Sequence, residues 1–452
     1  MTAALEQENA PQRLQALSAA LHDGTLLQMR KMLNGLHPAE IAHLLESLPI
    51  AQRELVWELV DSEHEGDVLL HVNDEVRATL IRQMETHELV AATEGLATDD
   101  LADILHDLPE AVISQVLQSM DAQDRERLES VLSYPENTAG GLMNTDTVTV
   151  RADVTVDVVL RYLRRRGQLP PMTDSLFVVS RDDKYQGTVA LGDLLTHDPA
   201  MTMGELMTHD YEAILALLPD TDVAAMFEYR NLISAPVIND EGRLLGRITI
   251  DDVVDVIRDE AEHSLLSMAG LKEEEDMFAP VITSTRRRAI WLGVNLLTAF
   301  LASWVIGLFD ATIQKLTTLA VLMSIVASMG GIAGTQTLTL VIRGMALGQI
   351  AGANARQLLA KELSVGVLNG LMWGLVVSAV TSIWFDNYQL GIVIAAAIII
   401  NLSNAALMGV TIPLLLRRLG VDPALAGGVI LTTFTDVIGF MAFLGLAALF
   451  LV

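Results

Sequence analysis

The stretch VDPALAGGVILTTFTDVIGFMAFLGLAALFLV, residues 421–452, decides the fold class of this chain. From residue 423 to the end it carries a single charged side chain, Asp436. A helix that crosses the hydrocarbon core of a bilayer needs about 20 predominantly apolar residues. The stretch is therefore long enough to span a membrane, and its one carboxylate falls near the middle of the span.

Four more uncharged runs lie upstream of this stretch, so we predict five transmembrane helices in all. The runs contain 21, 27, 23 and 30 residues and are separated by isolated charged positions. Each is long enough to cross a bilayer. The predicted spans are 289–309, 316–340, 363–385, 390–415 and 424–451.

The rest of the chain has the opposite character. Residues 1–280 carry a net charge of −32, whereas residues 281–452 carry +4, within a 452-residue chain of net charge −28. We expect no nucleic-acid partner, because such binding relies on a basic surface. The absence of cysteine excludes disulfides and thiolate chemistry. We expect no signal peptide, because residues 1–13 lack a basic patch followed by an apolar run.

Basic residues predict the orientation. One set of loop ends carries Arg286, Arg287, Arg288, Arg343, Arg356, Lys361, Arg417 and Arg418, and the other carries Lys315. Positive charge is retained on the cytoplasmic side. We therefore expect residues 1–288 in the cytoplasm and the C-terminus on the periplasmic side of a bacterial inner membrane.

Two internal repeats divide the acidic part. GLHPAEIAHLLESLP (35–49) recurs as GLATDDLADILHDLP (95–109), which predicts a solenoid of short amphipathic helices. SLFVVSRDDKYQGTVALGDLL (175–195) recurs as SAPVINDEGRLLGRITIDDVV (234–254), and each copy predicts strand, tight turn, strand and helix. The second repeat resembles a tandem cystathionine-β-synthase (CBS) domain.

A wider resemblance covers the whole chain. The order is an acidic helical region, SYPENTAGGLM (133–143), the CBS pair, an acidic helix, and five spans containing NLLTAFLAS, MGGIAGTQ, RGMALG, RRLGVDPA and TTFTDVIGF. This order is similar to the MgtE family of magnesium channels and transporters. The resemblance implies a homodimer with a pore between the protomers and cytosolic domains that sense Mg²⁺. Ile332 and Val429 depart from the family pattern near the expected ion path.

Asp436 is the principal candidate for an ion ligand. A carboxylate at mid-membrane depth costs roughly 2.5–3.5 kcal/mol on insertion scales and normally faces a polar cavity. Mg²⁺ prefers octahedral oxygen ligands and keeps several waters. A protonated aspartate bonded to a neighbouring helix is the alternative. The candidate pore-lining residues are Thr432, Thr433, Thr435, Gly331 and Gly428, although such glycines also serve helix packing.

An acidic stripe forms the second candidate site. Asp251, Asp255, Asp259 and Glu262 recur at helical spacing, and Val254, Ile257, Ala261 and Leu265 lie on the opposite face. Divalent cations would draw such a stripe towards other acidic surfaces. In the family that the chain resembles, this helix is the plug that closes the pore. A solvated helix face is the alternative.

Thr249 and Asp252 form a third candidate site. In CBS domains, a Thr and an Asp in this loop bind adenine nucleotides such as ATP. Thr-x-x-Asp is also a helix-start capping box. The first repeat carries Ala190 in place of the threonine, so at most one good nucleotide site is expected.

The sequence predicts a multidomain protein. Residues 1–133 form an acidic α-helical solenoid, 134–248 an α/β tandem CBS domain, 249–280 an acidic connecting helix, and 281–452 an all-α domain of five transmembrane helices. No catalytic constellation is present, so we expect no enzyme. We expect a Mg²⁺ channel that is closed by intracellular Mg²⁺. A channel for Co²⁺, Mn²⁺ or Ca²⁺ and a non-transporting membrane-anchored CBS sensor remain alternatives.

Overall fold

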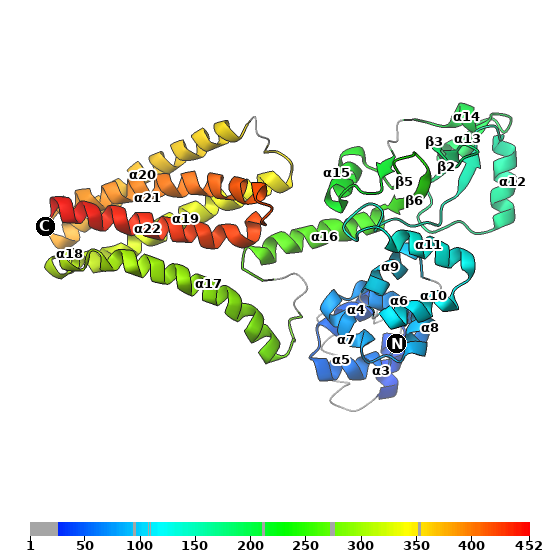
Figure 1. The fold of residues 1–452 in the computed structure, drawn as a ribbon, viewed down its shortest axis with the longest axis horizontal. Coiled ribbons are helices and arrows are strands. Elements are labelled where there is room, and N and C mark those ends of the chain that lie inside the picture. Colours follow the sequence, from blue (N-terminus) through cyan, green and yellow to red (C-terminus); the bar gives the residue numbers. More distant parts are fainter. Residues whose placement is uncertain are drawn as a thin grey trace. The chain divides into compact units, whose positions relative to one another are not determined.

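The structure is a computed structural model that describes residues 26–93, 96–106, 108, 110–209, 213–271, 276–350 and 354–452. The chain divides into two compact units. One comprises Met1–Ala261 with Glu274–Ala279, and the other Glu262–Glu273 with Pro280–Val452. The chain therefore passes between the units three times, and each unit is described by itself (Figure 1).

The first unit begins with short amphipathic helices, as the first repeat predicts. Ile41, Ala42, Leu44 and Leu45 are buried in one copy, and their counterparts sixty residues later are buried in the other. Parts of the second copy, including residues 95, 107 and 109, lie outside the described residues. The helices are α3 (Leu26–Leu33), α4 (Pro38–Glu46), α5 (Ile50–Trp57), α6 (Ser62–His71), α7 (Asp74–Ile81), α8 (Thr86–Thr93), α9 (Thr98–His106), α10 (Glu110–Ser119) and α11 (Ala122–Leu132).

The second repeat folds as predicted into paired strand–turn–strand–helix modules. Among the described residues these give two three-stranded sheets, ordered β1-β2-β3 and β4-β5-β6. In each sheet the first pair is parallel and the second antiparallel. The elements are β1 (Thr149–Arg151), α12 (Val156–Arg166), β2 (Ser175–Val179), β3 (Tyr185–Ala190), α13 (Leu191–Thr196), α14 (Met203–Leu206), β4 (Ile214–Leu215), α15 (Asp220–Arg230), β5 (Ser234–Ile238), β6 (Leu244–Thr249) and α16 (Ile250–Ser267).

The two modules match each other residue by residue. Asp183 and Gly242, which are 59 positions apart, both have positive φ at the turn between their strands. Gly187 and Gly246 occupy equivalent positions where another backbone passes closely. A Cβ atom there would lie 2.7 Å from the carbonyl oxygen of Thr208 and 2.6 Å from that of Asn144, respectively. Glycine is required at both because the strands are crossed by these segments.

Helix α16 occupies only part of the predicted connecting segment 249–280. It ends at Ser267, and Gly270 then adopts a φ of +72°. A side chain on Gly270 would overlap the indole of Trp291 in the next helix. Residues 276–280 are not helical, and the glutamates at 273–275 lie outside the described residues.

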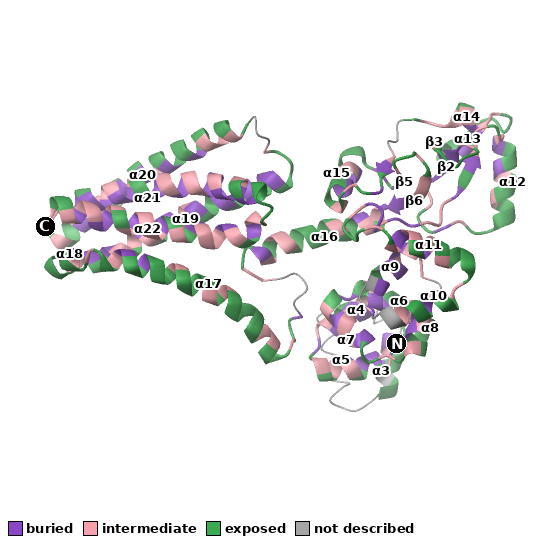
Figure 2. Cartoon of the chain, in the orientation of Figure 1, coloured by how far each residue is buried: buried purple, intermediate pink, exposed green. Residues whose placement is uncertain are grey.

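The second unit is a bundle of long helices. In the described part of the chain, five of them are long and apolar enough to cross a membrane. Helix α20 packs on α21, α21 packs on α19 and α22, and α17 packs against α22 and leaves most of its surface exposed (Figure 2). The helices are α17 (Val281–Gly307), α18 (Asp310–Lys315), α19 (Thr318–Ala346), α20 (Ala355–Phe385), α21 (Tyr388–Arg418) and α22 (Pro423–Phe450).

Candidate ion path and buried acidic cluster

Helix α22 has two contrasting faces. Gly427, Leu431, Thr435 and Gly439 recur every four residues, and all are buried. Gly428, Thr432 and Asp436 form the adjacent row and are partly or fully exposed within the described chain. Residues four apart lie on one helix face. The candidate ligand Asp436 therefore shares an open row with Gly428 and Thr432, and Thr435 lies on the packed row.

The hydroxyl groups of the threonines beside Asp436 donate hydrogen bonds within α22. The Oγ1 atoms of Thr432, Thr433 and Thr435 donate to the carbonyls of Gly428, Val429 and Thr432, at 2.8, 2.7 and 3.0 Å. Each hydroxyl oxygen keeps lone pairs that can accept from water or face a cation. The exposure of Thr432 favours it over buried Thr435 as a lining residue.

The candidate glycines separate into two groups. A Cβ atom added at Gly331 or Gly428 would meet no heavy atom within 4 Å outside its own helix and neighbours. A Cβ at Gly334 would contact Leu431 at 3.0 Å, and one at Gly427 would contact Leu338 at 3.2 Å. The first two glycines thus border open space, and the other two allow close helix packing.

Asn401 of α21 lies at the centre of the packed region. Its side chain is fully buried, and its Nδ2 donates to the carbonyl of Val326 in α19 at 2.9 Å. A side chain at Gly330 would overlap this amide, and a Cβ at Gly439 would lie 2.7 Å from Nδ2. Asn401 thus joins α19, α21 and α22 through a space that two glycines leave open.

Sequence reasoning missed two carboxylates of this unit. In the sequence, Glu362 only marked the start of an uncharged run. In the structure it is buried, and its Oε1 lies 2.7 Å from Nζ of Lys361. Asp422 caps the start of α22 by accepting from the backbone N–H groups of Ala424 and Leu425, at 2.8 and 3.2 Å. Oδ2 of Asp422 also lies 3.3 Å from Nε2 of His263 in α16.

The acidic stripe of α16 is exposed over its whole length. Asp251, Asp255, Asp259 and Glu262 are all accessible in the single chain. Arg258 of the same helix lies 3.5 Å from the carboxylates of both Asp255 and Asp259. The stripe is therefore partly neutralised at its centre by a cation from the same helix.

A more buried acidic group lies where α9 meets the start of α16. Asp99 accepts from Nδ2 of Asn144 at 3.1 Å and is almost fully buried. Burial raises the pKa of Asp100 to about 7, with further contributions from the charges of Asp99 and Asp251. Burial and the same two charges raise the pKa of Asp252 to about 8. Packing these carboxylates together therefore favours bound protons or cations.

The α9 aspartates had no signal in the sequence beyond their place at a helix start. Asp99 is hydrogen-bonded to Asn144, which lies 45 residues later, and the neighbouring charge of Asp251 comes from a segment about 150 residues later, so only the fold brings these groups together. Among the described residues, no three acidic or histidine side chains are grouped so as to hold a metal ion directly.

Thr249 and Asp252 contact each other at the start of α16. Thr249 is buried, and its Oγ1 and backbone N–H donate to Oδ2 of Asp252, at 3.2 and 3.4 Å. In a capping box, the acidic side chain at the third helical position accepts from the backbone N–H of the residue that precedes the helix, as Asp252 does here from Thr249. The geometry therefore matches the capping interpretation, and nucleotide binding stays a prediction.

Several helices able to cross a membrane, which follow a helical region and paired strand–turn–strand–helix modules, define a membrane protein with two further kinds of domain. Family comparisons agree with this class. Residues 323–446 match "Divalent cation transporter", 36–137 match "MgtE intracellular N domain", and 139–199 and 203–259 match "CBS domain". The chain belongs to the MgtE family.

Relatives and solved structures extend the comparison. The magnesium transporter MgtE of Thermus thermophilus is 29% identical over 96% of this chain and 98% of its own length. That of Bacillus subtilis is 25% identical over 95% and 96%. The cytosolic domain of the Mg²⁺ channel MgtE in complex with ATP is 30% identical, with a TM-score of 0.49, over 54% of this chain and 99% of that domain. The family matched by the membrane helices is described as a divalent cation transporter, and these relatives are named magnesium transporters, which is a non-enzymatic class.

Proposed function

We propose that this chain conducts Mg²⁺ into the cytoplasm across a bacterial inner membrane and is closed from inside by Mg²⁺. The observation that carries the proposal is the open row Gly428, Thr432 and Asp436 on α22, inside the segment that matches the divalent cation transporters. A carboxylate in a spanning helix marks an ion pathway when it is not buried in packing.

The chemistry of the row suits a hydrated ion. Mg²⁺ gives up its waters reluctantly and is usually held through one or two carboxylates with several waters retained. Asp436 supplies the carboxylate, and Gly428 and Gly331 leave room for the hydration shell. A membrane potential of 100 mV is worth about 2.3 kcal/mol per charge, so a divalent ion gains about twice that on entry.

The site is tested by Mg²⁺ flux into liposomes that contain the purified protein. Asp436→Asn keeps the side-chain volume and removes the charge, so we expect flux to fall at least tenfold. Asp310→Asn makes the same chemical change at an exposed position at the start of α18 and is the matched control. Wild-type flux through Asp436→Asn would eliminate this carboxylate as an ion ligand.

Closure by internal Mg²⁺ is supported by the cytosolic carboxylates. Asp99, Asp100 and Asp252 are packed together with raised pKa values, so a cation that neutralises them stabilises the compact arrangement. The exposed stripe of α16 offers further weak sites. A ligand that binds one conformation more tightly shifts the population towards it.

Neutralising Asp251, Asp255, Asp259 and Glu262 to Asn or Gln tests this closure. We expect inhibition of flux to require several-fold more internal Mg²⁺, with unchanged flux at low internal Mg²⁺. Equal sensitivity in the quadruple variant and the wild type would locate the sensor outside this stripe.

A homodimer with its pore between protomers is part of the proposal. Val254, Ile257 and Leu265 of α16 are 55%, 48% and 71% exposed in the single chain. Beside them, Phe227, Leu232 and Val253 line a groove between α15 and α16. An exposed apolar patch of this kind is typical of a protein–protein contact, and we assign this one to a second copy of the chain. Because the chain lacks cysteine, Ile257→Cys should form one specific crosslink between protomers.

The proposal includes three further predictions. The N-terminus is cytoplasmic, the C-terminus is periplasmic, and Thr249 and Asp252 bind an adenine nucleotide.

Other divalent ions remain alternative substrates. Ile332 departs from the family pattern, and its side chain is 58% exposed beside Gly331. The same liposome assay with Co²⁺, Mn²⁺ and Ca²⁺ separates these alternatives. A non-transporting sensor would give no flux of any of them.

A further inference from the structure

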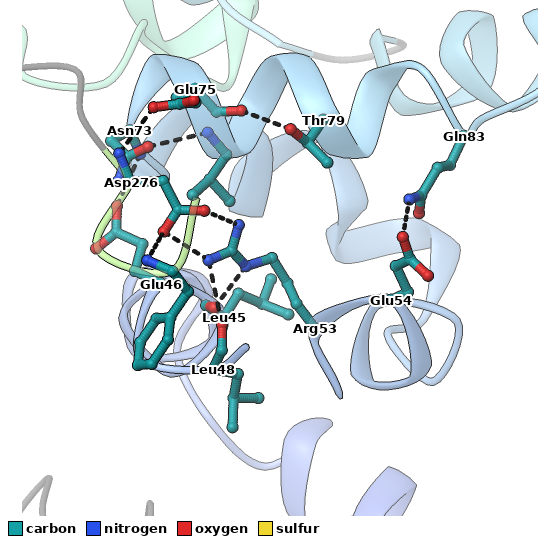
Figure 3. Close-up of polar contacts among 12 residues, drawn as sticks. Leu45, Glu46, Leu48, Arg53, Glu54, Asn73, Glu75, Thr79, Gln83 and Asp276 are labelled. Carbon is teal, nitrogen blue, oxygen red and sulfur yellow. Dashed lines mark hydrogen bonds and ion pairs between the residues drawn. The ribbon is translucent and has the colours of Figure 1, made fainter. Parts of the chain in front are cut away.

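A buried ion pair joins the helical region to the segment just before the first membrane helix. Nη1 and Nη2 of Arg53 in α5 lie 2.7 and 3.0 Å from Oδ2 and Oδ1 of Asp276 (Figure 3). Arg53 is 1% exposed and Asp276 is 7% exposed. The two parallel contacts form the bidentate geometry that gives Arg–carboxylate pairs their directionality.

Further hydrogen bonds fix both partners. Arg53 donates from Nε to the carbonyl of Leu45 at 2.9 Å and from Nη2 to that of Leu48 at 3.1 Å. The backbone N–H of Asp276 donates to Oε2 of Glu75 at 2.8 Å. A buried ion pair persists only where such additional bonds satisfy the charged groups, and removing one partner leaves a buried charge unpaired. The pair is therefore a built contact rather than a chance surface bridge.

The position of Asp276 gives the contact its consequence. Asp276 lies four residues before Pro280, the N-cap of α17. An extended chain covers at most about 3.6 Å per residue, so the five steps from Asp276 to Val281 reach about 18 Å. Without the pair, the covalent path from the helical region to α17 runs through both CBS modules and α16. The pair adds a second, direct link.

We propose that the Arg53–Asp276 pair is a clasp through which the helical region holds the start of α17. Displacement of the helical region is then transmitted to the first membrane helix without passing through the CBS modules. This role rests on the proposed function, because it deepens the account of closure by internal Mg²⁺. With the clasp open, conduction remains, and closure responds less to internal Mg²⁺.

The first test measures whether the pair holds the segment. The full chain has no cysteine, and Met277, next to Asp276, is 89% exposed, so a spin label at Met277→Cys reports this segment alone. We expect an immobilised label in the otherwise unchanged protein and a mobile label after Asp276→Ala. Asp276→Glu keeps the charge and should restore part of the immobilisation. Asp240→Ala removes an exposed acid from the same unit and should have no effect.

Asp276 is the residue to change, because its loss leaves Arg53 both carbonyl contacts within the helical region. Circular dichroism and protease resistance of the helical region check that it remains folded. An immobile label in a folded Asp276→Ala protein would overturn the clasp.

The second test measures coupling. In liposomes, Asp276→Ala should raise the internal Mg²⁺ needed for half-inhibition at least threefold and leave flux at low internal Mg²⁺ unchanged. A label at Ile282→Cys, which is 84% exposed at the start of α17, should change its mobility on adding Mg²⁺ in the wild type and lose that response in Asp276→Ala. An Mg²⁺ response retained by the variant would refute coupling.

The two readouts also separate this proposal from the proposed function. If the wild type carried no Mg²⁺, the proposed function would fail, and the labels at Met277 and Ile282 would still decide the clasp.

Discussion

The buried aspartates of α9 predict that pH and Mg²⁺ have opposite effects on the stability of the first unit. An ordinary aspartate has a pKa of 3.8, and that of Asp100 is raised to about 7 by burial and by neighbouring charges. Below about pH 4, Asp100 is protonated in both the folded and the unfolded chain, so it has no effect on stability. Between about 4 and 7 the folded state retains a proton that the unfolded state has lost, so stability falls as pH rises.

The magnitude follows from the size of the shift. About three units at 1.36 kcal/mol each correspond to about 4 kcal/mol, fully present above pH 7. Solvent reaches part of Asp100, and screening makes this an upper bound. Asp252, with a pKa of about 8, extends the same trend to higher pH, and its effect is not additive because the groups share their repulsion.

Hydrogen exchange of the full chain in detergent measures the effect. Without Mg²⁺, we expect protection factors in α9 and at the start of α16 to fall between tenfold and about a thousandfold from pH 5 to pH 8. Mg²⁺ should restore protection at pH 8 and change little at pH 5, where protons already neutralise the group. Asp100→Asn should flatten the pH dependence. Protection that rises with pH, or an Mg²⁺ effect of equal size at both pH values, would show that these aspartates do not destabilise the folded unit when they ionise.

Three further predictions concern the membrane unit and the CBS pair. Gly330→Ala should destabilise the bundle by about 1–3 kcal/mol, because the methyl group overlaps Asn401, whereas Gly331→Ala should fold normally and reduce flux; thermal unfolding and flux distinguish them. A cysteine after Val452 should react with an impermeant reagent outside intact cells, and protection there would overturn the predicted orientation. ATP should raise the melting temperature of the wild type more than that of Thr249→Val, and equal shifts would leave Thr249 with only its capping role.

Uniform chemistry along a segment made most of the fold predictable. Uncharged runs located the membrane helices, and the 59-residue repeat predicted the paired strand–turn–strand–helix modules. The observed boundaries of two helices differ from the predicted ones. Helix α17 begins at Val281, before Arg286, because charged residues can continue a helix outside the apolar core. Helix α16 is shorter than the predicted connecting segment because Gly270 adopts a left-handed conformation.

Contacts between distant segments were not predictable from one sequence. Asp436, Gly428 and Thr432 were candidates from the sequence, but only packing placed them on an open row, and only packing separated Gly331 from Gly330, which adjoins Asn401. Asp99 and Asp276 each find their partners far along the chain, in Asn144 and Arg53. Local patterns report which face of a helix is apolar, and they carry no information about which other segment covers it.

The proposed function combines two properties, conduction of Mg²⁺ and closure by Mg²⁺ from the cytosolic side. The most direct measurement is ion flux through the purified protein in liposomes at a negative internal potential, with internal Mg²⁺ varied. We expect Mg²⁺ entry that increases with the potential, exceeds entry of Ca²⁺, Mn²⁺ or Co²⁺, and falls cooperatively as internal Mg²⁺ rises. Absence of flux for every ion, or Mg²⁺ flux indifferent to internal Mg²⁺, would contradict it.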